Sequence, residues 1–158
     1  MSLQSLNENQ RTQGQPNLPY SGDALRCDLR RVHEAWRESR RRHDRISVYQ
    51  YLGAVFDLVM VWEKENRAVE RAKRALWLKR RGGGEKIEPF AAVIRCTSPR
   101  KKVDAKARSK WARALMFAAE YKSPAEPLEH FIRRHGGINL CAAELSRLSR
   151  TQTQTQTR

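Results

Sequence analysis

Residues 98–121 read SPRKKVDAKARSKWARALMFAAEY, and this stretch separates an apolar face from a cationic face more cleanly than the rest of the chain. Its apolar residues recur at the spacing of a helix that packs against a core. They are Val103, Ala107, Trp111, Ala114, Leu115, Ala118 and Tyr121. A neighbouring face carries a cationic stripe about three turns long, on the order of 16 Å, which is enough to follow several phosphates. Its members are Lys102, Lys106, Lys110 and Arg113.

Positive charge also gathers in two other segments. Residues 71–81 contain six cations and no acid, and residues 37–45 read RESRRRHDR. Cations at a helix C-terminus also complement the helix dipole, which explains the second segment equally well. We therefore predict nucleic-acid contact from residues 98–121 and 71–81 only, and not from residues 37–45. The predicted contact residues are Arg100, Lys101, Lys102, Lys106, Arg108, Lys110, Arg113, Arg71, Arg74, Lys79, Arg80 and Arg81.

The charge of the whole chain supports a polyanionic partner. The 158 residues include 32 Lys and Arg against 17 Asp and Glu, a net charge of +15. Such an excess opposes a compact fold by self-repulsion and is typical of proteins that bind polyanions. Nucleic acid is the expected partner, with DNA favoured over RNA, and an anionic membrane surface is not expected. The plain alternative is that the charge only keeps the protein soluble.

The longest apolar run, residues 51–62, predicts the central helix of the core. A helix capped by Ser47 has no proline to stop it before Arg81, and its first half is nearly all apolar. β-Branched residues would also allow a strand over residues 55–61, but the length of the pattern favours a helix. The run is too short to span a bilayer. Gly82, Gly83 and Gly84 then predict a turn or hinge, since the Lys-Ser/Thr of a phosphate loop is absent.

The remaining helices are predicted from start and stop signals. One begins near Ser21 or Asp23, one opens at Glu88-Pro89, one follows Ser123-Pro124 and stops at Gly136-Gly137, and one is capped by Asn139. The sequence thus predicts an all-α fold, a compact bundle of five or six helices. Residues 21–150 form a single domain, and residues 1–20 and 151–158 are polar, disordered tails.

No arrangement of residues typical of a catalytic or metal site is present. Cys27, Cys96 and Cys141 are far apart and lack CxxC spacing, which indicates a reducing compartment and hence a cytoplasmic protein. His130 and His135 have no Cys or carboxylate partner at zinc-ligand spacing. The N-terminus has no basic segment followed by an apolar one, so no secretory signal is expected. We expect no enzymatic activity, no metal and no cofactor.

Near the C-terminus, a small-residue segment and an Asn precede an Ala-Ala-x-Leu helix. The residues are Gly136, Gly137, Asn139, Ala142, Ala143 and Leu145. Residues 136–148 in this way resemble the helix-turn-helix of nucleoid and enhancer-binding proteins, which implies a DNA-binding element. The following SRLSR lacks the turn and second helix that this family places next. A helical hairpin that packs into the core is the alternative.

Two functions remain in competition. The first is a small accessory or regulatory protein that binds duplex DNA mainly through phosphate contacts. The second is a helical protein-protein adaptor or oligomerisation module, in which residues 51–62 lie partly at a subunit interface and an acidic partner meets the positive charge. Binding to single strands or RNA would need exposed aromatics among the cations. Trp77 and Phe117 are the candidates, and both are expected to pack.

Overall fold

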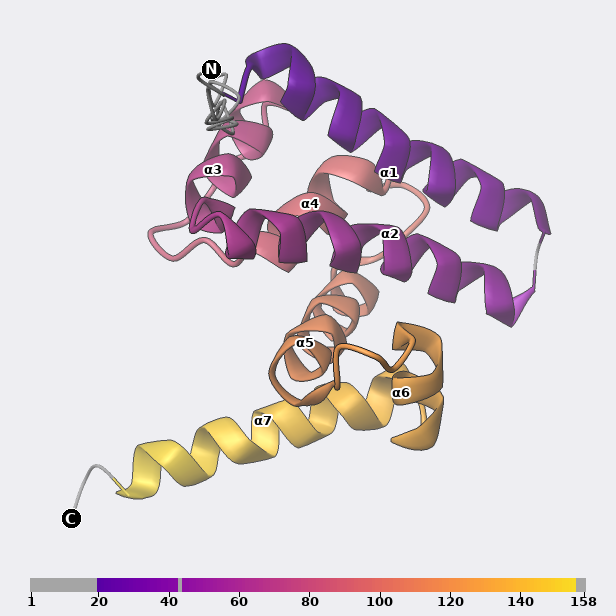
Figure 1. The fold of residues 1–158 in the computed structure, drawn as a ribbon, viewed down its shortest axis with the longest axis vertical. Coiled ribbons are helices and arrows are strands. Elements are labelled where there is room, and N and C mark those ends of the chain that lie inside the picture. The colour runs from indigo at the N-terminus through magenta and orange to yellow at the C-terminus, as the bar shows by residue number, and fades with distance from the viewer. Residues whose placement is uncertain (1–19, 43, 156–158) are drawn as a thin grey trace, which may run out of the picture.

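The computed structural model describes residues 20–42 and 44–155, and every regular element in this part of the chain is an α-helix (Figure 1). The helices are α1 (Gly22–Arg42), α2 (Arg45–Lys64), α3 (Ala68–Leu78), α4 (Pro89–Thr97), α5 (Ala105–Tyr121), α6 (Leu128–Arg134) and α7 (Ile138–Thr155). The all-α prediction is confirmed. The described residues form seven helices, against the five or six predicted, because the helix expected over residues 47–81 is divided into α2 and α3.

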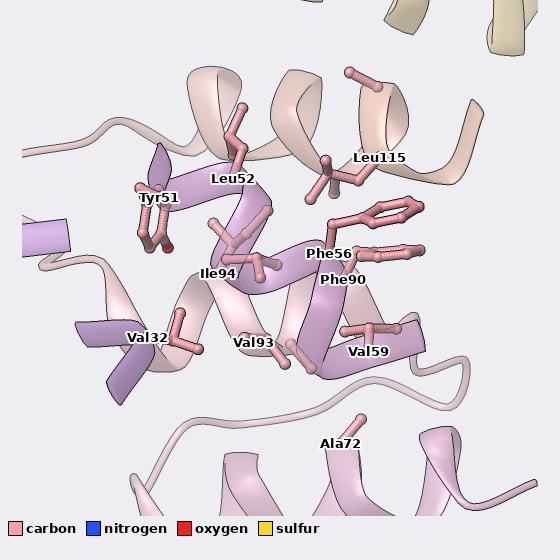
Figure 2. Packing of buried hydrophobic residues seen from close by; sticks show 14 of the residues in the cluster. Val32, Tyr51, Leu52, Phe56, Val59, Ala72, Phe90, Val93, Ile94 and Leu115 are labelled. Carbon is pink, nitrogen blue, oxygen red and sulfur yellow. The ribbon is translucent and has the colours of Figure 1, made fainter. Parts of the chain in front are cut away.

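Helix α2 is the centre of the core, as its apolar run predicts. Tyr51, Leu52, Val55, Val59 and Trp62 all have 0% of their surface exposed. Side chains from α1, α3, α4 and α5 surround them, and Figure 2 shows Val32, Ala72, Val93, Ile94 and Leu115 converging on this helix. This chain alone buries these five α2 side chains, so a subunit interface at residues 51–62 would have to use their outer face, where Val61 is exposed and Leu58 and Met60 are half-buried.

The break between α2 and α3 lies at Asn66, whose backbone is left-handed with φ 53°. Arg67 N donates to Trp62 O over 2.9 Å and Asn66 N donates to Glu63 O over 2.9 Å, which closes α2 with a Schellman motif. Asn tolerates this conformation better than most residues, because its short polar side chain can hydrogen-bond locally. The predicted single helix was wrong because neither Gly nor Pro marks the break.

The predicted starts of α2, α5, α6 and α7 need correction. Asp44 caps α2 by accepting from Ser47 N over 2.6 Å, and the Ser47 hydroxyl instead donates to Ser39 O at the end of α1. Asp104 caps α5 in the same way, through Ala107 N. Arg100, Lys101 and Lys102 therefore lie in the turn before α5, outside the helix on which the cationic stripe was predicted.

Helix α6 follows Pro127, so Ser123-Pro124 lies in the preceding turn, and α7 begins at Ile138, so Asn139 lies inside it. Helix α7 then continues unbroken to Thr155 and packs along α5 (Figure 1). The first part of the TQT repeat is therefore helical. Residues 136–148 match the alternative of a packed hairpin, because no turn and second helix follow Leu145 within the described residues.

The predicted N-terminal tail ends one residue earlier than expected. Residues 1–19 lie outside the described part, but Tyr20 packs on the domain. Its hydroxyl donates to Asp28, its carbonyl accepts from Arg74 Nη1 over 3.0 Å, and the Arg71 guanidinium lies 3.8 Å from its ring centroid. The packed domain therefore includes Tyr20, and two cations of α3 are held against it.

Helices α3 and α6 end in the same Schellman motif as α2, but with different residues at the left-handed position. Arg80 occupies it after α3, with φ 50°, and Gly136 occupies it after α6, with φ 85°. The bonds that define the motif are Arg81 N to Leu76 O, 2.8 Å, and Gly137 N to Ile132 O, 2.8 Å. Glycine is the preferred residue here, because a Cβ strains the left-handed backbone. Arg80 is therefore under conformational strain that Gly136 avoids.

Arg80→Gly should stabilise the fold, and Gly136→Ala should destabilise it. We expect a change of about 1 kcal/mol in each direction, since a left-handed non-glycine residue costs about 1–2 kcal/mol and the altered flexibility of the unfolded chain offsets part of it. Urea unfolding followed by far-ultraviolet circular dichroism measures both variants. A loss of stability in Arg80→Gly would show that the Arg80 side chain stabilises the fold by more than its strain costs.

Candidate nucleic-acid interface

Cations from α3, α4 and α5 meet on one surface. Lys79 and Arg81 follow the end of α3, Arg95 lies on α4, Arg100 lies in the turn before α5, and Arg108 lies on α5. We call these five residues the cationic cluster. Helix α4 packs against both α3 and α5, and Arg95 Nη2 donates to Gly82 O over 2.7 Å, which holds the glycine segment against α4. The end of segment 71–81 and part of segment 98–121 thus lie on either side of α4.

Three members of the cluster act electrostatically on a fourth, Arg108. Burial of the Arg108 guanidinium, followed by repulsion from Arg81, Arg100 and Arg95, lowers the pKa of Arg108. Arg108 Nη2 donates to Val103 O over 2.7 Å, and Arg108 Nε is buried with no hydrogen-bond partner among the described residues. An unpartnered buried donor on a cation is costly, and an anion bound beside Arg108 would offset the repulsion among these guanidinium groups.

The charge of the cluster is not neutralised within the described residues. The ion pairs of the described residues lie in α1, at the start of α3, in α6 and its preceding turn, and in α7. No described residue between 72 and 125 forms one. The acids nearest in sequence are Glu85, Glu88 and Asp104. Glu88 accepts from Phe90 N and Ala91 N as the cap of α4, and Asp104 caps α5. The cluster therefore presents positive charge to solvent.

A cavity of about 350 Å³ lies between α4 and α5, beside the cluster. Four apolar side chains and five polar or charged ones line it. The apolar residues are Ala91, Ala105, Ala112 and Met116, and the polar ones are Glu88, Arg95, Arg108, Ser109 and Arg113. Arg113 is fixed by a 3.1 Å bond from its Nη1 to Ser146 Oγ of α7. The cavity thus brings together the guanidinium groups of Arg95, Arg108 and Arg113. Its one carboxylate, Glu88, already accepts hydrogen bonds as the cap of α4.

The four members of the predicted stripe are divided among three hollows. Arg113 lines the cavity beside α4, together with Arg108, whereas Lys106 and Lys110 line a separate hollow that includes Ile138 and Asn139 of α7. Lys102 shares a third hollow, which Trp36 and Trp111 also line, with Arg40 of α1. The basic end of α1 thus reaches Lys102 but does not line the cavity beside the cluster.

One predicted contact residue has a structural role instead. Arg71 is only 8% exposed, forms an ion pair with Glu65 and stacks on the Tyr20 ring, so we remove it from the expected contact set. Arg74 is half-buried and donates to the Tyr20 carbonyl, and it stays in the set. Arg95 was absent from that set and belongs to the cluster. The sequence offered one reason to predict Arg95 as a contact residue, which is that it lies beside a stretch poor in acids.

The exposure of Trp77 differs from the sequence expectation. Its side chain is 79% exposed, because α3 buries the opposite face, which carries Ala68, Ala72, Ala75 and Leu76. The helical wheel contained this signal, since Trp77 lies about half a turn from that alanine face. Phe117 is buried against Phe131 and His135, as expected.

The cysteine nearest the cluster is held in its thiol form. Burial raises the pKa of Cys96 to about 11, although Lys79, Arg81 and Arg95 oppose this shift. Among residues 20–42 and 44–155, no group of three or more His, Cys, Asp or Glu side chains is placed to hold a metal ion. None of the described helices combines the length and apolar character needed to cross a membrane.

The chain matches no protein-family model, and no curated protein or solved structure shows significant similarity to it.

Proposed function

We propose that this protein binds nucleic acid, with duplex DNA as the expected ligand, and that phosphate contacts supply most of the affinity. The observation that carries the proposal is the cationic cluster, in which five cations from three parts of the fold have no acidic partner among the described residues. Phosphate contacts of this kind position a protein on a duplex without reading its sequence. An accessory or regulatory role is consistent with such binding.

The kind of cation also supports phosphate as the ligand. Four of the five cluster residues are arginines, whose planar guanidinium groups can donate two parallel hydrogen bonds to one phosphate. Bonds to the carbonyls of Gly82 and Val103 already orient two of them, Arg95 and Arg108. A donor that is held in place loses less side-chain entropy when it binds, so these arginines are suited to recognise an anion.

Salt titration tests the proposal. Binding of the full chain to a labelled blunt duplex of about 20 base pairs, followed by fluorescence anisotropy, should weaken by about 10²- to 10³-fold between 50 and 200 mM NaCl. The logarithmic salt slope should be about −4 to −5 if each cluster cation displaces one counterion. Absence of binding at 50 mM, or a slope near zero, would contradict the proposal.

An acidic protein partner is the competing explanation of the charge. Polyglutamate of similar length, added as a competitor in the same titration, separates the two partners. We expect it to displace the duplex only at a large excess of charge, because carboxylates spaced along a flexible chain do not match the fixed guanidinium groups. Displacement at equal charge would favour the adaptor function.

A further inference from the structure

Trp77 is the most exposed large apolar side chain in the described part of the protein. It is 79% exposed, whereas the other exposed large apolar residues there lie between 47% and 55%. No aromatic ring or protein cation is stacked on it among the described contacts. The other tryptophans are placed differently, since Trp36 and Trp62 are buried and Trp111 packs against Trp36 and Tyr51. A free indole face is therefore presented to solvent.

Cations lie on both sides of this indole. Lys73 is one helical turn before Trp77, and Arg80 is three residues after it, with Arg80 N bonded to Trp77 O over 3.0 Å. Both cations are exposed. Arg81 follows directly and belongs to the cationic cluster. Trp77 thus stands near the end of α3, where the cluster residues Lys79 and Arg81 follow, and the strained, exposed Arg80 adds a further cation to this end.

The chemistry of this arrangement fits a nucleobase that is not paired within a duplex. In a duplex the faces of the bases are stacked on one another, so an indole ring can stack only on an unpaired or terminal base. A membrane surface or a second copy of the chain would instead be favoured by a contiguous apolar patch. Trp77 is a single ring bordered by cations, with Val69 the only other exposed large apolar residue of α3.

We propose that Trp77 stacks on an unpaired base while Lys73, Arg80 and the cationic cluster contact the phosphates next to it. This inference rests on the proposed function and narrows its ligand to DNA in which a single-stranded segment adjoins a duplex. A ligand of this kind lets the cluster follow the duplex and lets Trp77 engage the first unpaired nucleotides.

The test compares three ligands at one salt concentration: a blunt 20-base-pair duplex, the same duplex with a ten-thymidine overhang, and the thymidine strand alone. The wild-type protein should bind the overhang duplex about 5- to 150-fold more tightly than the blunt one, which corresponds to one stacked base. The overhang should also quench tryptophan fluorescence more than the blunt duplex does. In Trp77→Ala the ratio of the two affinities should fall to about 1, and the additional quenching should disappear.

Two further variants make the test specific. Trp77→Phe keeps an aromatic face and should retain part of the preference, whereas Val69→Ala removes another exposed apolar side chain of α3 and should leave the ratio as in the wild type. Trp77 makes no core contact, so the variants should fold, which circular dichroism checks. Salt slopes should be the same for wild type and Trp77→Ala, because stacking displaces no counterion.

The outcomes separate this inference from the proposed function. Equal binding of blunt and overhang duplexes by the wild-type protein, or an unchanged ratio in Trp77→Ala, overturns the role of Trp77 and leaves duplex binding intact. Failure of all three ligands to bind overturns the proposed function together with the inference. Light scattering tests whether Trp77 instead contacts a second copy of the chain. Flotation with vesicles containing phosphatidylserine tests whether it contacts a membrane surface. A dimer or vesicle complex that Trp77→Ala abolishes, with the DNA ratio unchanged, would assign the ring to that partner.

Discussion

Lys79→Gln, Arg81→Gln and Arg100→Gln, combined in one variant, should weaken binding to a blunt DNA duplex by about a thousandfold at 50 mM salt. Each change removes one charge-assisted contact to a phosphate, worth about 1.5 kcal/mol at the lower end of the usual range. The logarithmic salt slope should become shallower by about 3, since fewer counterions are released. None of the three side chains has a hydrogen bond or ion pair among the described residues, so the fold should be retained.

The matched control removes the same amount of charge elsewhere. Arg26, Arg41 and Arg147 each pair with an acid three residues away on α1 or α7. Changing all three to glutamine alters the net charge equally but leaves the cluster intact, and the affinity should fall by less than about tenfold because distant charges are screened. Equal loss in both variants would mean that binding follows net charge and that the cluster is not the contact surface.

Helix content and the position of the core were predictable because they depend on apolar spacing along the chain. The run at residues 51–62 is the centre of the core, and Glu88 followed by Pro89 does begin a helix. The boundaries were less accurate because they depend on single capping contacts. Asp104 was available as a cap, but the apolar spacing placed Val103, two residues before the real start of α5, inside the predicted helix.

The candidate surface was predictable in part. The sequence shows which segments lack acids, and the fold brings Arg81, Arg100 and Arg108 from two of them close together. It does not show which cations are held by tertiary contacts. Arg71 illustrates this, because its partners Glu65 and Tyr20 are brought to it by the α2–α3 turn and by the packing of the segment before α1. The exposure of Trp77 is local to α3 and could have been predicted from its alanine face.

Tyr51→Ala should destabilise the protein by about 3–5 kcal/mol, a large share of the stability of a domain of this size. The Tyr51 ring, on α2, contacts Trp36 of α1 at 5.3 Å and Trp111 of α5 at 6.0 Å between centroids. Its hydroxyl lies 2.8 Å from Thr97 Oγ1 of α4. One side chain therefore joins four helices, and Figure 2 shows it beside Leu52 on α2. Urea unfolding at pH 7 measures the loss.

Tyr51→Phe separates the ring from its hydroxyl. Thr97 Oγ1 donates to Val93 O, so Tyr51 donates to Thr97, and Tyr51→Phe should cost only about 1 kcal/mol at pH 7. A loss below about 1.5 kcal/mol in Tyr51→Ala would show that the surrounding helices close over the space and that this ring does not join them.

Comparison of Tyr51→Phe with the wild type gives a pH dependence with a definite sign. Burial raises the pKa of Tyr51 to about 12, whereas the unfolded chain ionises near the ordinary value of 10.0. The stabilising contribution of the neutral hydroxyl is therefore complete below pH 10 and is lost as the pH rises through about 12, a change of about 2–3 kcal/mol. Tyr51→Phe has no group to ionise, so its stability should fall less steeply than that of the wild type between pH 9.5 and 11.5. Burial also raises the pKa of Tyr20, which both proteins retain, so the difference between them isolates Tyr51. Parallel curves would show that the Tyr51 hydroxyl ionises as readily in the folded protein as in the unfolded chain.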